Sequence, residues 1–200
     1  PSWSVMAKKL FPQFKDYISM AMTPMVLTAR LYKKDHPDVR IVFIGPCTAK
    51  KLEASRRTIR SDVDFVLTFE EMQGIFDAKG IVPSEMPVDP EEEFSTGTSL
   101  GRGFAVTGRV ANAVKEAIKE IDPDREVKIE RADGLRECRK MLMMAKAGKY
   151  NGYLLEGMGC PGGCVAGAGT MQPIKKSQAA VGLYARQAKH KTSDETEHIK

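Results

Sequence analysis

Short β-branched runs alternate with helical patterns along this chain of 200 residues. The strand-like runs occupy residues 39–44, 64–68, 127–130 and 153–155, and the patterns between them have helical spacing. Strands that alternate with helices form parallel sheets, because each helix returns the chain to the start of the next strand. The sequence therefore predicts an α/β fold, with a largely parallel sheet or sheets flanked by helices.

The boundaries of several predicted helices carry recognisable signals. Thr23-Pro24 is typical of an N-cap followed by proline in the first turn, and it begins a predicted helix over residues 25–34. Thr68 caps a helix that ends at Lys79-Gly80. Further helical patterns cover residues 3–15, 105–121, 135–147 and 177–189.

Residues 81–103 have no periodicity and form a predicted loop long enough to indicate a functional or lobe-joining role. We therefore predict one domain over residues 1–189, with room for two lobes joined near residues 81–103. Residues 190–200 are polar, and we expect them to form a mobile tail.

Charge and composition exclude several classes of protein. The formal net charge is +5, but cations and acids are interleaved, as at residues 115–120, so we expect no nucleic-acid binding. No apolar run approaches the roughly 20 residues that a membrane-spanning helix needs, so we expect no membrane partner. Four cysteines without a secretory pattern predict a reducing compartment and a cytoplasmic location.

The chemistry is concentrated in residues 156–164, where Cys160 and Cys164 stand among glycines just after a predicted strand. Ligands bind at the carboxyl ends of strands in α/β sheets. Glycine allows close approach of the backbone, whose N–H groups then face an anion. An iron–sulfur cluster held by thiolates is such an anion.

A second motif, Gly45-Pro46-Cys47, also follows a predicted strand and continues into Lys50 and Lys51. Two cations beside a thiolate lower the pKa of the thiol and offset the charge of a bound cluster. Because both motifs follow strands, we expect them to be able to meet in one cleft.

The cysteine motifs also fit two other kinds of site, a zinc site and a dinucleotide-binding loop. The spacing of Cys160 and Cys164 also suits zinc, and Cys47 and Cys138 could complete a four-cysteine set. Cys138, however, shares a helical pattern with apolar neighbours and is expected in the core. Residues 157–162 fit the dinucleotide pattern G-x-G-x-x-G, but residues 177–183 lack the acidic residue that this pattern requires.

Residues 44–53 resemble the second signature of iron-only ([FeFe]) hydrogenases, a Pro-Cys-x-x-Lys-x-x-Glu element. Residues 156–164 resemble the third signature, and Pro1-Ser2-Trp3 resembles the end of the first, whose Thr-Ser-Cys-Cys would stand immediately upstream. The likeness continues through Ser19, Thr23-Pro24, residues 103–108 and Gln172-Pro173. The chain thus resembles a fragment of the C-terminal H-cluster domain of the large subunit.

The resemblance implies a fold of the hydrogenase H-domain type and a specific cofactor, a [4Fe–4S] cubane joined to a two-iron subcluster that carries CO and cyanide. It implies that Cys47 and Cys160 ligate the cubane and that Cys164 bridges it to the two-iron unit. Lys50 would donate a hydrogen bond to a cyanide, and Met158 would pack beside the cluster.

The implied activity is the reversible reduction of protons to dihydrogen, with electrons from a ferredoxin-like carrier or from N-terminal iron–sulfur domains. Ser19 aligns with a serine of the family's proton path, and Glu53 with the acid of the second signature. Glu53 also stands three residues after Lys50, a spacing typical of a helical ion pair. Because the fourth cubane ligand belongs to the first signature, we expect the isolated fragment to be inactive and to hold its cluster badly, if at all.

Three departures from the family pattern indicate a divergent member. Gly45 stands where a methionine is usual, Arg109 replaces a glycine, and residues 167–173 are longer than the usual triple glycine with Gln-Pro. These features resemble sensory members more than fast enzymes. The alternatives are therefore a hydrogen or redox sensor with slow turnover, and a non-hydrogenase iron–sulfur or zinc protein of the same fold.

Overall fold

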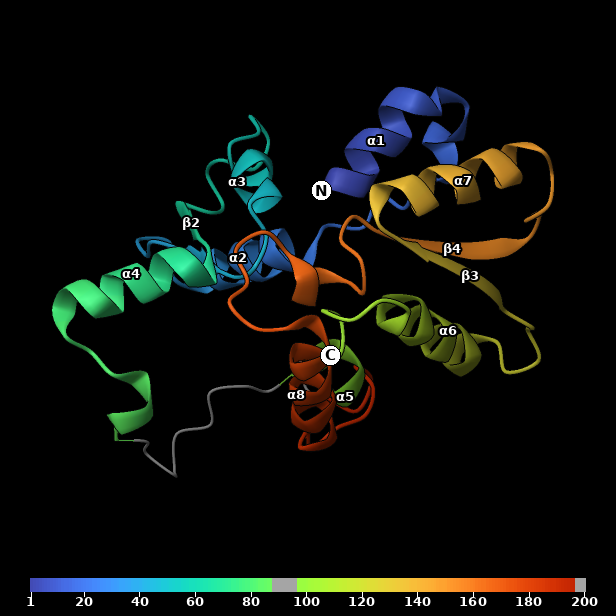
Figure 1. The fold of residues 1–200 in the computed structure, drawn as a ribbon. Helices are drawn as coiled ribbons and strands as arrows, with labels where there is room; N and C mark the ends of the chain where they lie inside the picture. Colours follow the sequence, from blue (N-terminus) through green and yellow to red (C-terminus); the bar gives the residue numbers. More distant parts are fainter. Residues whose placement is uncertain (88–96, 197–200) are drawn as a thin grey trace. The chain divides into compact units, whose positions relative to one another are not determined.

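The computed structural model describes residues 1–87 and 97–196, and it divides into two compact units (Figure 1). Unit 1 comprises Pro1–Met86 and the short return segment Gly167–Met171, whereas unit 2 comprises Pro87–Ala166 and Gln172–Lys200. The first boundary falls inside the range 81–103, where the sequence predicts a junction. Sequence reasoning did not predict that the chain returns to unit 1 after the second cysteine motif.

Unit 1 contains four α-helices, two strands and two 3-10 helices among its described residues. In chain order these are α1 (Ser2–Leu10), η1 (Pro12–Tyr17), α2 (Pro24–Asp35), β1 (Val42–Ile44), α3 (Ala49–Ala54), β2 (Phe65–Leu67), α4 (Phe69–Lys79) and η2 (Pro83–Glu85).

The sheet of unit 1 is a parallel pair, with Val42 opposite Phe65 and Ile44 opposite Leu67. The core beside it consists of the buried face of α2 together with Val63. Partly buried apolar side chains from β1, β2 and the α3–β2 connection pack against this core. The short β-branched runs at residues 39–44 and 64–68 therefore form adjacent parallel strands, as the alternating pattern predicts.

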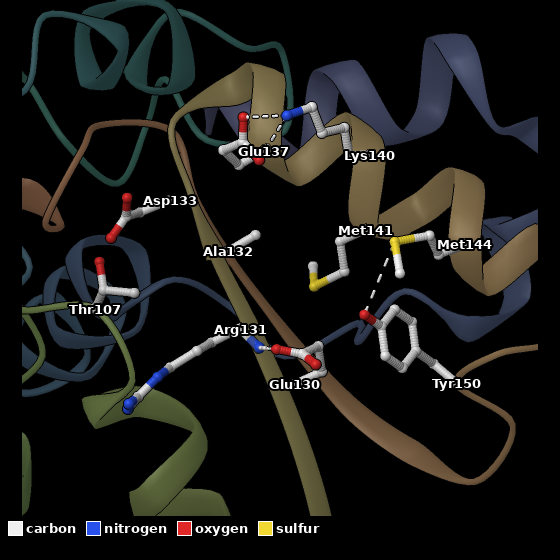
Figure 2. Close-up of a pocket in the computed structure, with 10 residues that line it drawn as sticks. All are labelled: Thr107, Glu130, Arg131, Ala132, Asp133, Glu137, Lys140, Met141, Met144 and Tyr150. Carbon is white, nitrogen blue, oxygen red and sulfur yellow. Dashed lines mark hydrogen bonds and ion pairs between the residues drawn. The ribbon is translucent and has the colours of Figure 1, made fainter.

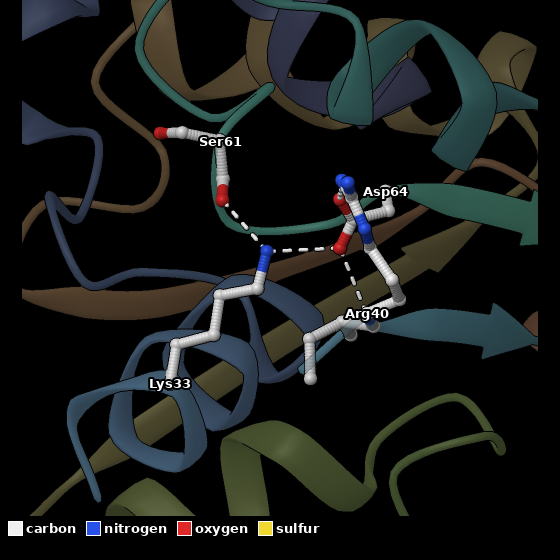
Figure 3. Close-up of polar contacts among 5 residues, drawn as sticks. Lys33, Arg40, Ser61 and Asp64 are labelled. Atoms are coloured by element: carbon white, nitrogen blue, oxygen red, sulfur yellow. Dashed lines mark hydrogen bonds and ion pairs between the residues drawn. The ribbon is translucent and has the colours of Figure 1, made fainter. Parts of the chain in front are cut away.

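Asp64 ties α2 to the start of both strands (Figure 3). Its carboxylate accepts hydrogen bonds from Lys33 Nζ at 2.8 Å, Arg40 at 3.0 Å and the Ile41 backbone N–H at 2.8 Å. Lys33 also donates to the Ser61 carbonyl at 2.9 Å. The bonds from Lys33, the Ile41 backbone and Arg40 hold the pKa of Asp64 far below its usual range.

Helix α4 has the boundaries that the sequence predicts. The Thr68 hydroxyl accepts from the Glu71 N–H at 3.1 Å, and the Glu71 carboxylate accepts from the Thr68 N–H at 2.8 Å, which completes a capping box. Gly80 ends the helix with a φ of 65°, a left-handed conformation that favours glycine.

Unit 2 contains a second parallel pair and four α-helices among its described residues. In chain order its elements are α5 (Ser99–Arg102), α6 (Arg109–Ile121), β3 (Lys128–Asp133), α7 (Leu135–Lys146), β4 (Tyr153–Met158), η3 (Cys164–Ala166) and α8 (Ile174–Arg186).

Strands β3 and β4 pair in parallel register from Lys128 opposite Tyr153 to Asp133 opposite Met158. Figure 1 shows α7 along one side of this sheet and α6 along the opposite side. Helix α7 buries Cys138, whose side chain is fully enclosed, together with Met141 and Leu142. The prediction that Cys138 belongs to the core is confirmed.

Two predicted irregular regions contain more structure than expected. The range 81–103 includes η2 and α5, and its residues 88–96 lie outside the described part of the chain. In the predicted tail, the carbonyls of His190 and Lys191 accept from the backbone N–H groups of Ser99 and Leu100, at 2.8 and 3.2 Å. Residues 197–200 lie outside the described residues, and the mobility of the tail stays a prediction. Among the described helices, none is long and apolar enough to cross a membrane.

Candidate cysteine site

The cysteine loop, residues 160–164, begins two residues after the carboxyl end of β4. It turns through Gly162 and Gly163, whose φ values of 83° and 104° lie in a region that side-chain-bearing residues rarely adopt. The turn closes with a hydrogen bond from the Gly163 N–H to the Cys160 carbonyl at 3.0 Å. Cys164 then begins the short 3-10 helix η3, so both cysteines belong to one tightly folded loop.

The backbone of residues 103–108, the segment just before α6, holds the cysteine loop in place. The Thr107 N–H donates to the Gly162 carbonyl at 3.3 Å, and the Val165 N–H donates to the Ala105 carbonyl at 3.2 Å. A Cβ atom at Gly163 would lie 2.5 Å from the Ala105 oxygen and 2.8 Å from the Thr107 nitrogen. Only glycine therefore fits where the two segments meet.

Glu156, within β4, is a buried carboxylate with two backbone partners, and it is 8% exposed. Oε1 accepts from the Gly108 N–H at 2.7 Å, and Oε2 accepts from the Ala111 N–H at 2.8 Å. Both donors belong to the beginning of α6, where Gly108 offers no side-chain cap. Sequence reasoning quoted Glu156 within the motif but assigned it no role, although an acid in a half-buried strand was the available signal.

In unit 1, Cys47 lies in the turn between β1 and α3. The Gly45 N–H continues the parallel ladder by donating to the Leu67 carbonyl at 3.0 Å, and the Lys50 N–H donates to the Cys47 carbonyl at 3.2 Å. A Cβ at Gly45 would lie 2.9 Å from the ring of Phe43. The departure from methionine at position 45 thus accompanies an aromatic ring that fills the adjoining space.

Lys50 and Glu53 form an ion pair one helical turn apart, as their spacing predicts, with Nζ and Oε2 separated by 2.6 Å. Their side chains are only 14% and 4% exposed. Burial acts to raise the pKa of Glu53, but the hydrogen bond and the charge of Lys50 outweigh it and lower that pKa overall. The Thr23 hydroxyl oxygen is buried and has no hydrogen-bond partner among the described residues.

The return segment Gly167–Met171 packs on the Cys47 turn within unit 1. The Gly169 N–H donates to the Pro46 carbonyl at 2.9 Å, and the Glu70 N–H donates to the Gly169 carbonyl at 3.3 Å. A side chain at Gly167 would overlap the Pro46 carbonyl. The long glycine-rich stretch that sequence comparison marked as a departure therefore supports the residue next to Cys47.

The predicted ligands belong to different units: Cys47 lies in unit 1, whereas Cys160 and Cys164 lie in unit 2. All three are half-buried, and none of the four cysteines forms a disulfide. Within residues 1–87 and 97–196, no three His, Cys, Asp or Glu side chains are gathered as a metal-binding set. Convergence of the three thiols therefore stays a prediction.

The remaining predicted residues lie as follows. Met158 is the half-buried last residue of β4, and its carbonyl lies 3.3 Å from the buried Cys138 Sγ. Ser19 is exposed in the connection between η1 and α2, where its Oγ accepts from the Ala21 N–H at 3.2 Å.

A pocket of about 440 Å³ lies beside β3 and α7 in unit 2 (Figure 2). Thr107 and Asp133 face one another at one end of it, and Met141, Met144 and Tyr150 lie toward the other. The Thr107 hydroxyl oxygen is buried without a hydrogen-bond partner in the described part of the chain. This oxygen belongs to the segment that holds the cysteine loop, and sequence reasoning did not single it out.

A family model described as "Iron only hydrogenase large subunit, C-terminal domain" matches residues 1–168. The chain belongs to this family. The resemblance read from the cysteine motifs is thereby confirmed, as is the α/β fold of the hydrogenase type.

Relatives of two kinds resemble the chain to a similar degree. It is 28% identical to the periplasmic [Fe] hydrogenase large subunit of Nitratidesulfovibrio vulgaris, over 87% of this chain and 50% of that protein. It is 29% identical to a probable cytosolic Fe–S cluster assembly factor of Aedes aegypti, over 86% of this chain and 46% of that protein. The chain thus spans about half the length of these curated relatives.

The fold resembles that of a solved [FeFe]-hydrogenase from Chlamydomonas reinhardtii, with a TM-score of 0.76 and 21% identity. The match covers 100% of this chain and 68% of that one. At this identity the likeness establishes the fold alone. The chain is therefore an [FeFe]-hydrogenase-like C-terminal domain, and its relatives include both hydrogenases and iron–sulfur assembly factors.

Proposed function

We propose that this chain is part of an H-cluster domain of an [FeFe] hydrogenase, in which Cys47, Cys160 and Cys164 hold an iron–sulfur cofactor. The observation that supports this most is the cysteine loop at the carboxyl end of β4. Its glycines take conformations and close contacts that a side chain would prevent, while both thiols are half-buried rather than sealed in the core. Such a loop is suited to presenting thiolates to a ligand.

The residues present fit an iron–sulfur cofactor by their donor chemistry. Thiolates are soft ligands that suit iron–sulfur clusters, and glycine-rich turns bring backbone N–H groups close to cluster sulfurs. Lys50 adds a cation three residues after Cys47. Cys138, by contrast, is enclosed in the core, and burial raises the pKa of its thiol to about 11, which suits a structural role.

In the proposed assignment, Cys47 and Cys160 would ligate a [4Fe–4S] cubane, Cys164 would join it to a two-iron subcluster, and Met158 would pack beside the cofactor. When bound, this cofactor would supply the redox centre at which protons and dihydrogen interconvert. The contribution of the chain is to hold the thiols at fixed positions and to set the electrostatics around them.

The covalent chain is consistent with a shared cofactor. Gly167, three residues after Cys164, belongs to unit 1 and packs on Pro46, the neighbour of Cys47. Three residues of extended chain span at most about 11 Å. This short connection supports the proposal that Cys164 and Cys47 serve one cofactor.

Lys50 and Glu53 are proposed to act as a pair. The lowered pKa of Glu53 makes it a carboxylate at neutral pH, so it fixes the Lys50 ammonium by the 2.6 Å contact. Lys50 would then present its remaining N–H groups to an anionic cyanide ligand. Glu53 and Ser19 stay proposed members of a proton route, with Oε and Oγ as the atoms that would accept and pass the proton.

The proposed partners are dihydrogen, protons and a ferredoxin-like carrier or further iron–sulfur domains. A cytoplasmic location is part of the same proposal. The relatives differ in this respect, because the hydrogenase of N. vulgaris is named periplasmic and the assembly factor of A. aegypti is named cytosolic.

The decisive test is infrared spectroscopy of the complete subunit, produced anaerobically together with the family's maturation proteins. We expect CO and cyanide stretching bands, and we expect Cys164→Ser to abolish both these bands and dihydrogen turnover while the protein still folds. Bands with little turnover would indicate a sensor. Normal turnover in the Cys164→Ser variant would remove the bridging assignment.

A second candidate is a non-hydrogenase iron–sulfur protein, and the identity to an assembly factor favours it as much as the identity to a hydrogenase favours the first. On this candidate the cysteines hold a simple iron–sulfur cluster without the two-iron unit. Iron and sulfide in the purified protein, with no CO or cyanide bands after maturation, would establish it in place of the hydrogenase assignment.

A further inference from the structure

Glu156 connects β4, the strand that leads into the cysteine loop, to the beginning of α6. Helix α6 directly follows residues 103–108, the segment that supports the loop. Its two carboxylate oxygens accept from Gly108 and Ala111, at 2.7 and 2.8 Å, so β4 supplies the cap that α6 lacks. The first N–H groups of a helix have no intrahelical partner, and a negative charge is stabilising there. The arrangement is enclosed, because Glu156 is 8% exposed and Gly108 is buried.

The segment fixed by this carboxylate is the one on which the cysteine loop rests. Thr107, adjacent to Gly108, donates its N–H to Gly162, and Ala105 accepts from Val165. Glu156 also precedes Cys160 by only four residues of chain. The loop is thus held at two places, by the end of β4 and by residues 103–108, and Glu156 joins these two supports.

We propose that Glu156 is a positioning residue for Cys160 and Cys164, and that it acts through the beginning of α6 and residues 103–108. This role rests on the proposed function only in its last step, the effect on a bound cluster. Without the carboxylate, the N–H groups of Gly108 and Ala111 would lose their acceptors in an enclosed place, and the supporting segment would no longer be tied to β4. The loop would then sample several arrangements, and its two thiols would lose their fixed spacing.

A helix cap alone would have different consequences. It would stabilise α6, and its loss would loosen residues 109–121 without altering a cluster held by the cysteines. The positioning role requires two further effects, faster opening of the backbone bonds between the two segments and an altered spectrum of the bound cluster.

The experiment uses the complete subunit carrying Glu156→Gln, which keeps the size of the side chain but turns an NH₂ group toward a backbone N–H. The matched control is Glu137→Gln, at an acid of α7 whose side chain is 53% exposed and paired with Lys140. In the metal-free protein, hydrogen–deuterium exchange is followed at the amides of Thr107 and Val165. We expect Glu156→Gln to speed it about tenfold, the effect of losing a buried hydrogen bond. The control should match the unmodified protein.

The second measurement is the electron paramagnetic resonance spectrum of the reduced subunit after reconstitution with iron and sulfide. We expect shifted or broadened signals in Glu156→Gln and an unchanged spectrum in the control. Unchanged exchange at Thr107 and Val165, or faster exchange confined to residues 109–121 with an unchanged spectrum, would overturn the positioning role. Faster exchange in a subunit that takes up no iron, even unmodified, would contradict the proposed function and leave Glu156 as the residue that orders the loop.

The amide of Cys138, in the core of unit 2, reports whether the variant is folded. If Glu156→Gln exposes it, Glu156→Asp is scored instead, because aspartate keeps the charge but withdraws the oxygens from α6. Exposure of Cys138 in both variants would overturn the proposal, since Glu156 would then support the whole unit rather than the loop.

Discussion

The Cys47 turn and the cysteine loop both follow the carboxyl end of a strand in a parallel pair, but they are stabilised in different ways. At the Cys47 turn, a mostly buried ion pair between Lys50 and Glu53 lies within the helix that follows. At the cysteine loop, the contacts are made by backbone groups, and positive-φ glycines allow the two segments to approach.

This difference indicates a division of labour between the two motifs. The Cys47 turn carries a mostly buried charge three residues after its cysteine, so its most sensitive residues should be the two members of the ion pair, Lys50 and Glu53. The cysteine loop fixes two thiols by the shape of its backbone, and its most sensitive residues should be glycines. The comparison is therefore tested by substituting a glycine of the cysteine loop and, separately, a charged residue of the Cys47 turn.

The largest effect is expected at Gly163. In Gly163→Ala the new Cβ would lie 2.5 Å from the Ala105 oxygen, and the residue would keep a φ of 104° only under strain. Backbone strain and overpacking together should lower the free energy of unfolding by about 3–5 kcal/mol and reduce iron uptake. Denaturant unfolding and iron analysis of the reconstituted subunit measure both quantities.

The control for this prediction is Gly152→Ala. Gly152 also has a positive φ, 76°, but a Cβ there would meet nothing within 4 Å. It should cost only about 1 kcal/mol and leave iron uptake unchanged. Equal losses of unfolding free energy and iron uptake in the two variants would show that the positive φ alone is responsible. The close contact with residues 103–108 would then not explain the effect at Gly163.

A smaller effect is expected from the charge at the Cys47 turn. Lys50→Ala would leave the buried Glu53 carboxylate without its partner and should lower the free energy of unfolding by roughly 2–3 kcal/mol. Lys51→Ala is the matched control, because Lys51 pairs with Glu71 where both side chains are more than 40% exposed. Such a surface pair contributes little.

The pH dependence sharpens the same prediction. Lys50 lowers the pKa of Glu53, so the pair contributes stability above the unfolded pKa of the carboxyl group and loses it as the pH falls through the folded value. The free energy of unfolding, measured at decreasing pH, should therefore fall in the unmodified subunit, and it should fall less in Lys50→Ala. If both lysine variants unfold alike at every pH, the ion pair is not what stabilises the Cys47 turn.

Local patterns in the sequence predicted much of the fold. The alternation of β-branched and helical runs indicated the parallel strands, and Thr68 and Gly80 marked the ends of α4 because their signals act within a few residues. The strand β4 extends to Met158, beyond the predicted end at 155, since its pairing with β3 extends through the glycine-containing residues. Pairing with a distant partner is not visible in local propensity.

For the candidate site, the sequence predicted which residues belong to it but not how they are held in place. The motifs identified Cys47, Cys160 and Cys164, but not the carboxylate of Glu156 capping a helix that begins 47 positions earlier, at Arg109. Thr23 shows the opposite case: it occupies the predicted N-cap position of α2, yet its hydroxyl makes no capping bond. Contacts between remote segments depend on the assembled fold, so a one-dimensional pattern does not contain them.

The smallest effect in free energy concerns Cys138, which separates a core thiol from the half-buried thiols of the two motifs. Burial raises the pKa of Cys138 from its ordinary value of 9.0 to about 11. A raised pKa of a thiol stabilises the folded state below the unfolded pKa, and this stability is lost as the pH rises from about 9 through 11. By pH 9 the loss should be only a few tenths of a kcal/mol.

The clearer measurement is alkylation of the metal-free subunit at pH 8, followed by mass spectrometry. Cys47, Cys160 and Cys164 should react while Cys138 stays unmodified until denaturant is added, because its side chain is fully enclosed. Reaction of Cys138 at the rate of Cys160 in the folded subunit would show that the core of unit 2 opens as readily as the cysteine loop. The distinction between an enclosed core thiol and the accessible thiols of the two motifs would then be wrong.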